Sequence, residues 1–301
     1  MPTLKDIMGR IETVSNIKKV TNAMQLVAAA KLTKAQERAQ TVRPYAQELD
    51  GILGTLAALS GDSEGDTPMT MRFFEDGPEL ESIRESLFGE TNAERPALVL
   101  ITSDRGLCGS FNTNLIRRAN KFMKDHPGTR LITLGRKGQT FFNTLKIVPE
   151  FHREGMSDKL AIGEIREITG RLVELYVKGE VDSVFLVYAK FRKGTLSDTT
   201  TQQFLPIPPV EGREGGDVYI LEPSRDQVFE SLIPLYATTA IFSAFADSFA
   251  SEYGARMAAM QQATKNAEEI VEDLTIMRNR MRQAAITKEL AEIVGGAEAL
   301  K

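Results

Sequence analysis

The stretch from Ser224 to Val294 constrains the fold more than any other part of this sequence. Its composition predicts a single helix of roughly 70 residues, on the order of 105 Å long at about 1.5 Å per residue. No proline follows Pro234, and Gly254 is the only glycine between there and Gly295. A compact domain of this size is much smaller across than such a helix. The helix must therefore protrude or pass through another structure.

The C-terminal half of this helix carries a stripe of apolar residues spaced alternately four and three apart. The stripe comprises Ala263, Ala267, Ile270, Leu274, Met277, Met281 and Ala284. This heptad spacing needs a partner helix to cover it.

The partner is predicted at the other end of the chain. A second stripe comprises Leu4, Ile7, Ile11, Val14, Ile17, Val20, Met24 and Val27, and continues through Leu32, Ala35, Ala39, Val42, Ala46, Leu49, Leu53 and Leu56. We therefore predict a long antiparallel coiled coil of the N- and C-terminal helices with a globular insertion between them. The alternative, in which both stripes are ordinary core faces of one globular domain, stays open at this point.

The first helix is predicted over residues 3 to about 59, with a kink or break at Pro44 because proline removes a backbone hydrogen bond. The expected domains are an N-terminal coiled-coil helix (1–59), an acidic linker (60–95), an α/β domain (96–210) and a C-terminal coiled-coil helix (211–301). Between Asp62 and Glu94 there are ten acidic residues against two basic ones. We expect this linker to be a solvated surface segment, with a short helix over 78–88.

From Pro96 to Pro209 the heptad spacing of apolar residues is no longer present. Segments with strand-like composition alternate there with segments of helical periodicity. Strands are predicted at 97–102, 130–134, 146–151, 183–189 and 199–207, and helices at 112–126, 137–145 and 159–178. The first strand is a short continuous apolar run, as a buried parallel strand should be. The fold class is therefore mixed α/β, with a Rossmann-like, mostly parallel sheet inserted between the long helices. A further short strand is predicted at 217–221.

Composition narrows the possible functions. The 301 residues carry a formal net charge of -4 and a pI near 5.5, which argues against nucleic-acid binding. We find no 18-residue apolar run and expect no membrane span, and the N-terminus has no apolar signal-peptide core. One cysteine and two histidines leave little material for a disulfide framework or a zinc site. No metal and no cofactor are predicted.

A glycine-rich turn, Gly106-Leu107-Cys108-Gly109, follows the first predicted strand. Its spacing is neither that of a dinucleotide-binding fingerprint nor that of a phosphate-binding P-loop, so a structural turn is favoured over nucleotide binding. Cys108 would be a nucleophile only with a histidine nearby, and a buried small side chain is the favoured alternative. Asp104 and Arg105 in the same turn are interpreted as an ion pair or a partner contact.

Two features of the long helices indicate binding. Basic residues are grouped on them, at Lys18, Lys19, Lys31, Lys34, Arg38, Arg278, Arg280, Arg282 and Lys288. The C-terminal tip carries Ile286, Leu290, Ile293, Val294 and Leu300, far from the predicted globular part. An exposed apolar patch of this kind marks an interaction site.

Three segments together resemble the gamma subunit of the rotary proton-translocating ATP synthase, of the bacterial type. They are TSDRGLCG at 102–109, AMQLVAAAKL at 23–32, and the run from ARMAAM at 255–260 to RQAAITKEL at 282–290. The three motifs occur in the family's order, and the resemblance covers essentially the whole chain.

The resemblance implies a central rotor shaft. It would couple proton-driven rotation of the c-ring to ATP synthesis or hydrolysis at catalytic sites on a ring of three alpha and three beta subunits. The shaft would have no catalytic residues of its own. The implied partners are the alpha, beta and epsilon subunits and the c-ring, with no nucleic acid. The implied location is peripheral, on the cytoplasmic face of the bacterial inner membrane, with membrane association only through the c-ring.

The resemblance also implies contact residues. Those facing the alpha/beta ring would be Met24, Lys31, Arg278, Arg282, Gln283, Ile286, Leu290 and Ile293. Those at the foot, near the c-ring and epsilon, would be Gln203, Phe204 and Leu205. The single cysteine argues against the paired-cysteine redox control of chloroplast relatives. The acidic linker is longer than the family minimum.

Two other interpretations are kept. A coiled-coil adaptor or chaperone with an α/β head would form a soluble particle without alpha and beta subunits, and would tolerate polar substitutions at the tip. A Rossmann-type enzyme with a helical arm would bind a cofactor at Gly106–Gly109.

Overall fold

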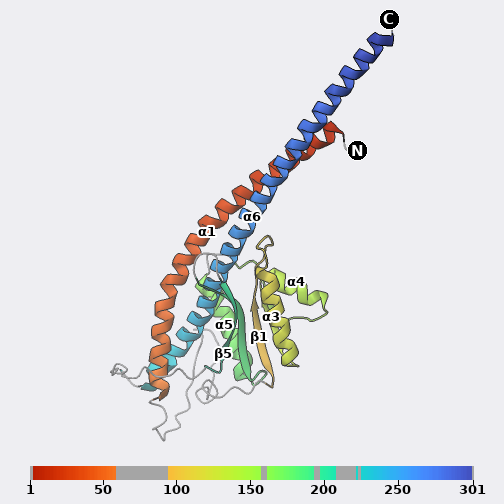
Figure 1. Cartoon of the computed structure of the whole chain (residues 1–301). Coiled ribbons are helices and arrows are strands. Elements are labelled where there is room, and N and C mark those ends of the chain that lie inside the picture. The colour runs from red at the N-terminus through yellow and green to blue at the C-terminus, as the bar shows by residue number, and fades with distance from the viewer. Residues whose placement is uncertain are drawn as a thin grey trace. The chain divides into compact units, whose positions relative to one another are not determined.

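A computed structural model describes residues 3–58, 94–156, 161–192, 197–207, 222 and 225–299. Its helices and strands, labelled in Figure 1, follow in chain order: α1 (Leu4–Ala58), β1 (Pro96–Ile101), α3 (Phe111–Asp125), β2 (Arg130–Leu134), α4 (Arg136–Thr144), β3 (Phe151–Arg153), α5 (Ile162–Val177), β4 (Ser183–Phe191), β5 (Ser197–Leu205) and α6 (Arg225–Ala299). Most of the predicted acidic linker, the helix at 78–88 and the strand at 217–221 lie outside the described residues.

The chain forms two compact units. Residues 1–29 and 256–301, called the two-helix unit below, contain the start of α1 and the end of α6. Residues 30–255, called the α/β unit, contain everything between, including the remaining parts of both long helices.

The α/β unit is built around one five-stranded sheet with the order β3-β2-β1-β4-β5. Four strands are parallel, and β5 pairs antiparallel with β4. All six residues of the central strand β1 are buried, with Val99 aligned between Ile132 of β2 and Leu186 of β4. The predicted α/β fold is confirmed. The third strand is Phe151–Arg153, so it begins where the predicted strand 146–151 ended. Residues 146–150 do not form a strand, and only Glu150 donates a backbone hydrogen bond to β2, at Leu131.

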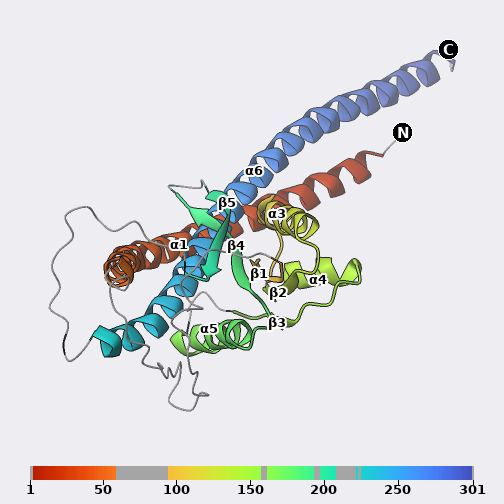
Figure 2. The same cartoon turned by 90° about the horizontal axis from the view of Figure 1, so that it is seen from below.

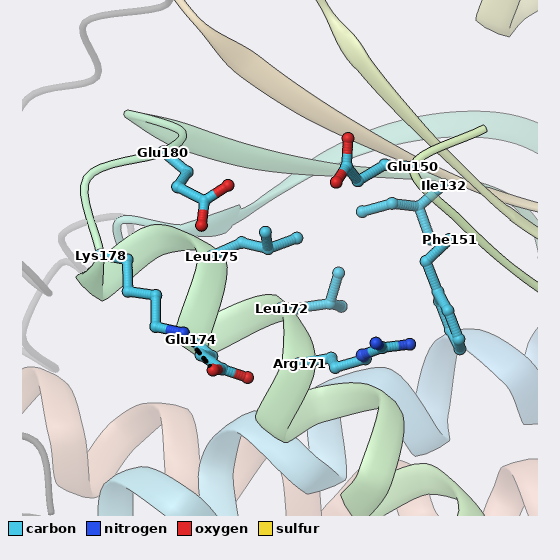
Figure 3. Close-up of a pocket in the computed structure, with 9 residues that line it drawn as sticks. All are labelled: Ile132, Glu150, Phe151, Arg171, Leu172, Glu174, Leu175, Lys178 and Glu180. Carbon is cyan, nitrogen blue, oxygen red and sulfur yellow. Dashed lines mark hydrogen bonds and ion pairs between the residues drawn. The ribbon is translucent and has the colours of Figure 1, made fainter. Parts of the chain in front are cut away.

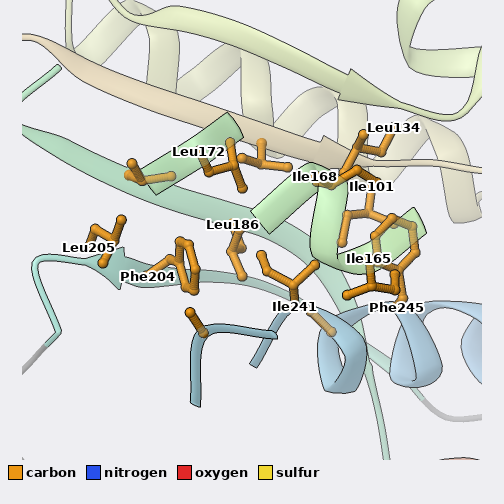
Figure 4. Packing of buried hydrophobic residues seen from close by; sticks show 14 of the residues in the cluster. Ile101, Leu134, Ile165, Ile168, Leu172, Leu186, Phe204, Leu205, Ile241 and Phe245 are labelled. Carbon is orange, nitrogen blue, oxygen red and sulfur yellow. The ribbon is translucent and has the colours of Figure 1, made fainter. Parts of the chain in front are cut away.

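Helices cover both faces of this sheet, as Figure 2 shows from below. One core cluster joins α3 and α4 to the sheet and includes Leu98, Leu100, Phe111, Leu115, Ala119 and Phe142. The opposite cluster joins α5 and α6 to the sheet (Figure 4) and includes Ile165, Ile168, Leu172, Leu186, Ile241 and Phe245. Within the α/β unit, α6 is therefore a core helix of the domain.

The two long helices run antiparallel in both units. In the α/β unit, α1 continues as helix through Pro44, so the predicted break is absent, and Arg43 pairs with Asp247 on α6. In the two-helix unit, Lys18 pairs with Glu268 and Thr21 with Thr264. The residue numbers of the contacting partners therefore increase along α1 and decrease along α6, as they do in an antiparallel pair. The predicted antiparallel pairing of N- and C-terminal helices is confirmed.

Helix α6 bears on the expectation that no stretch of this chain spans a membrane. The stretch Ser231–Val294 contains an 18-residue window with mean hydropathy 1.3, long and apolar enough to cross a membrane. Of that window, 56% is buried inside the protein. Burial against the sheet explains the apolar composition, because a helix that packs in a core needs few charged residues.

Candidate functional site

The interface between the two helices of the two-helix unit follows a heptad period, but its register differs from the prediction. On α6 the buried or half-buried residues spaced four and three apart are Met260, Thr264, Ala267, Val271, Leu274, Arg278 and Met281. Ile270 and Met277, predicted in the stripe, are 47% and 43% exposed, and Ala284 is also exposed. The stripe instead passes through Val271 and Arg278, the next residues along the chain.

The same correction applies to α1. Its inward stripe passes through Ile7, Ile11, Val14, Lys18, Thr21, Gln25 and Ala28. The predicted members Ile17, Val20 and Val27 are exposed.

Polar contacts explain this register. The hydroxyl of Thr264 donates to Thr21 Oγ1 at 2.8 Å, and Lys18 Nζ donates to Glu268 Oε1 at 2.6 Å. A search for apolar periodicity alone misses this register, because polar residues such as Lys18, Thr21 and Thr264 occupy positions among the apolar ones.

Large apolar side chains lie on the outside of the two-helix unit. They are Met8, Ile17, Val20, Leu26 and Val27 on α1, and Ile270, Ile276, Met277, Ile286, Leu290, Ile293 and Val294 on α6. Isolated exposed apolar residues are ordinary, but twelve on two helices form an unusually apolar surface. This arrangement fits a helix pair that is itself surrounded by other protein.

The ring-facing residues expected in this unit are distributed over that surface. Ile286, Leu290 and Ile293 are between 49% and 68% exposed, and Arg282 and Gln283 are exposed beside them. Met24 is half-buried. Arg278 is half-buried and donates a long hydrogen bond of 3.4 Å to Asn279. Leu300, also predicted at the tip, lies outside the described residues.

Lys31 belongs to the α/β unit and faces α6. Its Nζ donates to the hydroxyl of Tyr253 at 3.3 Å and lies 5.2 Å from the centre of that ring. Such an ammonium–aromatic contact is favourable. Lys31 therefore connects α1 to α6 within the protein, a role that the sequence did not indicate.

The three predicted foot residues lie at the end of β5 and differ in accessibility. Phe204 and Leu205 are 3% and 1% exposed and belong to the core cluster on the α5 and α6 side of the sheet. Gln203 is partly exposed, and its side-chain amide donates to the carbonyl of Pro206 at 2.7 Å. Only Gln203 of the three offers side-chain surface to a partner.

The glycine-rich turn is closed by its own hydrogen bonds. Cys108 is 2% exposed and its Sγ accepts a hydrogen bond from Asn112 Nδ2 at 3.1 Å. The carboxylate of Asp104 accepts from the backbone N–H groups of Arg136 and Gly155, at 2.9 and 3.0 Å. Asp104 therefore joins three loops of the sheet, and the expected Asp104–Arg105 ion pair is replaced by these backbone contacts.

Neither histidine lies where it could activate Cys108. His126 is the residue that follows α3, and its Nδ1 lies within hydrogen-bond distance of the carbonyl oxygen of Phe122. His152 lies on β3. Among the described residues, no group of three histidine, cysteine, aspartate or glutamate side chains could hold a metal ion.

Two hollows in the α/β unit were not indicated by any sequence motif. One, of about 180 Å³, lies between α5 and the β2–β3 side of the sheet (Figure 3). There Arg171 lies over the ring of Phe151, while Glu174 pairs with Lys178 and Glu180 with Arg130. These pairings leave no evident acid–base couple for chemistry.

The second hollow, of about 330 Å³, lies between α1, the β4–β5 strands and α6. It is lined by Arg43, Tyr188, Lys190, Gln202 and Asp247, among others. Burial raises the pKa of Tyr188 to about 12, and the phenol donates to Gln202 Oε1 at 2.7 Å. A phenol held protonated in this way contributes structure rather than acid–base chemistry at neutral pH.

Comparison with known proteins agrees with this geometry. A family model described as ATP synthase matches residues 3–300. The ATP synthase gamma chain of Heliobacterium modesticaldum is 38% identical over 309 residues, covering 100% of both chains. That of Symbiobacterium thermophilum is 40% identical over 300 residues, covering 99% of this chain and 98% of the relative.

Two cryo-EM structures have a similar fold. A chain of the Euglena gracilis mitochondrial ATP synthase, OSCP/F1/c-ring, rotational state 3, matches with a TM-score of 0.66 and 18% identity, over 99% of this chain and 94% of that one. A chain of the Tetrahymena thermophila mitochondrial ATP synthase central stalk/c-ring matches with a TM-score of 0.56 and 20% identity. The match covers 81% of this chain and 99% of that one.

Proposed function

We propose, for a chain that belongs to the family of ATP synthase gamma chains, that the outer apolar surface of the two-helix unit is where the rotor contacts the ring of alpha and beta subunits. The family forms the central rotor shaft of the membrane-associated enzyme. The chain is accordingly a non-catalytic subunit, and ATP chemistry takes place in the beta subunits. What remains to be assigned is which residues carry the contacts.

The observation that carries this proposal is the distribution of side chains in the two-helix unit. The helix pair contacts itself through apolar residues such as Ile11 and Leu274 together with the polar pairs Thr21–Thr264 and Lys18–Glu268, while twelve other large apolar side chains are exposed. Burying an exposed apolar side chain of this size contributes about 1.5–3 kcal/mol. A surrounding apolar partner would therefore gain considerably from covering this surface.

Within that surface we assign two kinds of contact. Ile286, Leu290 and Ile293 provide apolar contact for the part of the shaft that turns within the ring. Arg282 and Gln283 provide polar contact one turn earlier, where the planar guanidinium suits a carboxylate on a beta subunit. Met24 and Arg278 are half-buried, so only part of each side chain is available to a partner. They contribute to the same contact region.

We propose further that the α/β unit contacts the epsilon subunit and the c-ring. Gln203 contributes side-chain surface there, while Phe204 and Leu205 hold β5 in the core and so fix its position. The enzyme then sits on the cytoplasmic face of the bacterial inner membrane, one gamma chain per three alpha and three beta subunits. The division into 1–59, 60–95, 96–210 and 211–301 serves as the working domain scheme.

Rotation of the shaft would be coupled to ATP chemistry because its contacts differ from one beta subunit to the next. A shaft that presents different side chains to each beta subunit stabilises a different state of each site, and rotation exchanges these states in turn. The adaptor interpretation predicts no such dependence, since an adaptor would bind without alternating the affinities of three nucleotide sites.

The test is reconstitution with alpha and beta subunits, followed by single-molecule rotation. A bead is attached through Val148→Cys, because Val148 is 84% exposed while the native Cys108 is 2% exposed. ATP-driven stepping in one direction supports the proposal. A complex that hydrolyses ATP without rotation, or no complex at all, would favour a static stalk or an adaptor.

Point variants then test the assigned surface. Ile286→Ser with Leu290→Ser should weaken ATP-coupled rotation, while the control Glu289→Ala, on the same exposed stretch of α6, should retain it. Equal effects of both variants would contradict the apolar assignment.

A further inference from the structure

The hollow of about 330 Å³ between α1, the β4–β5 strands and α6 is large enough to hold a small molecule. Small-molecule sites in proteins have volumes of about 300–1,000 Å³. Ala240, Ser243 and Ala244 on α6 line this hollow, together with Ala46 on α1. Because these side chains are short, they leave the space between the two helices and the sheet unfilled.

The hollow is formed by regular helices and strands. Tyr236, Ala240 and Ala244 are spaced four apart on α6, so they lie on one face of that helix. Tyr188 and Lys190 are two residues apart on β4, so they lie on one face of the sheet. The hollow is therefore a preformed feature of the α/β unit.

Several hydrogen-bond donors that line the hollow lack a partner within the described part of the chain. They are Lys190 Nζ, Gln202 Nε2 and the hydroxyls of Thr239 and Ser243. The oxygen of the Gln202 amide accepts from Tyr188, which leaves the amide nitrogen as a donor. Thr239 is only 8% exposed, and a buried hydroxyl without a partner costs free energy. A ligand with acceptor oxygens would satisfy these groups.

The charged residues that line the hollow carry one positive charge in excess. Arg43 and Lys190 are the cations and Asp247 is the carboxylate. Arg43 pairs with Asp247 at 2.9 Å, and the Asp247 side chain is 5% exposed. Among the described residues Lys190 forms no ion pair, although its charge opposes the rise that burial causes in the pKa of Asp247. Lys190 is therefore available to an anionic ligand.

The size and the remaining lining indicate that this ligand is larger than a single anionic group. At roughly 30 Å³ per water molecule, the hollow corresponds to about eleven waters, more than one carboxylate or phosphate group fills. Tyr188, Tyr236 and the three alanines provide aromatic and apolar surface beside the donors. Such a combination of apolar surface with a few convergent polar groups is typical of small-molecule sites.

We propose that this hollow binds a small organic anion, a molecule with one carboxylate or phosphate group on an aromatic or aliphatic body. Lys190, Gln202, Thr239 and Ser243 donate to the anionic group, and the tyrosines and alanines contact the body. The ligand would contact α1, the sheet and α6 at once, and would stabilise the folded α/β unit by binding to it alone. This site is separate from the rotor contacts proposed above.

The experiment titrates the full chain with phenyl phosphate and, separately, with benzoate, and measures binding by saturation-transfer NMR. Benzyl alcohol provides the same ring without the charge, and inorganic phosphate provides the charge without the ring. Phenyl phosphate or benzoate should bind saturably, with a dissociation constant in the millimolar range expected for so small a molecule. Both control compounds should bind at least tenfold more weakly.

Matched variants test the residues assigned to the site. Lys190→Gln should weaken binding about tenfold, the loss expected when one hydrogen bond to a charged group is removed, while Lys190→Arg should retain most of the affinity. Lys121→Gln, which changes an exposed lysine on α3 at the opposite face of the sheet, should leave binding unchanged. Ala240→Leu should fill part of the hollow and abolish saturable binding, with thermal denaturation as the check that the variant is folded.

The proposal is overturned by any of three results. The first is the absence of saturable binding of both phenyl phosphate and benzoate to the wild-type chain. The second is equal affinity for benzyl alcohol or for inorganic phosphate, which would mean that charge and body are not recognised together. The third is an equal response to Lys190→Gln and Lys121→Gln, which would place the binding elsewhere.

Discussion

Arg43 Nη2, on α1, lies 2.9 Å from Asp247 Oδ1, on α6. The same nitrogen donates to the carbonyl of Phe191 at the end of β4. One guanidinium thus connects both long helices and the sheet within the α/β unit. Burial raises the pKa of the Asp247 carboxyl, and the charge of Arg43 opposes that rise.

Removing Arg43 should destabilise the protein strongly. In Arg43→Ala the carboxylate of Asp247, whose side chain is 5% exposed, would remain buried without its cation. Breaking a buried pair from one side costs about 3–5 kcal/mol, and the partial exposure of Arg43 reduces our expectation to about 2–3 kcal/mol. Urea denaturation measures the change.

A second variant separates the unpaired charge from lost packing. In an Asp247→Asn background, Arg43→Ala should cost less than about 1 kcal/mol, since no buried charge is then left unpaired. If Arg43→Ala costs the same in both backgrounds, the ion pair is not the source of the stability.

Tyr188 should make stability depend on pH in the alkaline range. Burial raises its pKa from an ordinary value of 10 to about 12 in the folded protein. Between these values the unfolded phenol loses its proton while the folded one keeps it, so the free energy of unfolding falls as pH rises. The loss over this window should approach about 2 kcal/mol.

Tyr188→Phe should flatten this dependence, measured by urea denaturation at a series of pH values between 9 and about 12. Gln202→Ala removes the hydrogen bond to the phenol but leaves Tyr188 in place, and should retain the steeper fall. Wild type and Tyr188→Phe with the same slope would show that another group is responsible.

Gly135 should tolerate no side chain. It has φ of 109°, and an added Cβ would lie 2.1 Å from the carbonyl oxygen of Thr102. Gly135→Ala should therefore destabilise the α/β unit by about 3 kcal/mol or more, through both backbone strain and a clash with main chain. Thermal denaturation checks this.

Gly128 is the matched control. It has φ of 90°, but an added Cβ would meet no atom within 4 Å. Gly128→Ala should cost only the backbone strain, about 1–2 kcal/mol. Equal costs at the two glycines would mean that the close approach to Thr102 relaxes without penalty.

The corrected register of the two-helix unit can be tested by a pair of alanine variants. Ile270→Ala should change the stability of the isolated chain by no more than about 0.5 kcal/mol, because Ile270 is exposed. Leu274→Ala, in the helix–helix interface, should cost about 1–2 kcal/mol. Equal costs at the two positions would restore the register predicted from the sequence, which placed both residues in the interface.

A large part of the fold could be predicted from local sequence patterns. The breaker-free stretch after Pro234 predicted α6, found over Arg225–Ala299, and the apolar run after Pro96 predicted β1. Helix periodicity and strand composition are properties of neighbouring residues, so such elements can be recognised without tertiary information. The three segments at 23–32, 102–109 and 255–290 together likewise indicated the family before any geometry was known.

The tertiary structure decided which side of each pattern faces inward. Leu274 and Ile270 look alike in sequence, yet one is in the interface and the other exposed, because the threonine contact between Thr21 and Thr264 fixes the register. It also placed Phe204 and Leu205 in the core and set Arg43 against Asp247, some 200 residues apart. Sequence determines which faces are apolar, but contacts between distant residues decide which of those faces the protein buries and which it leaves for a partner.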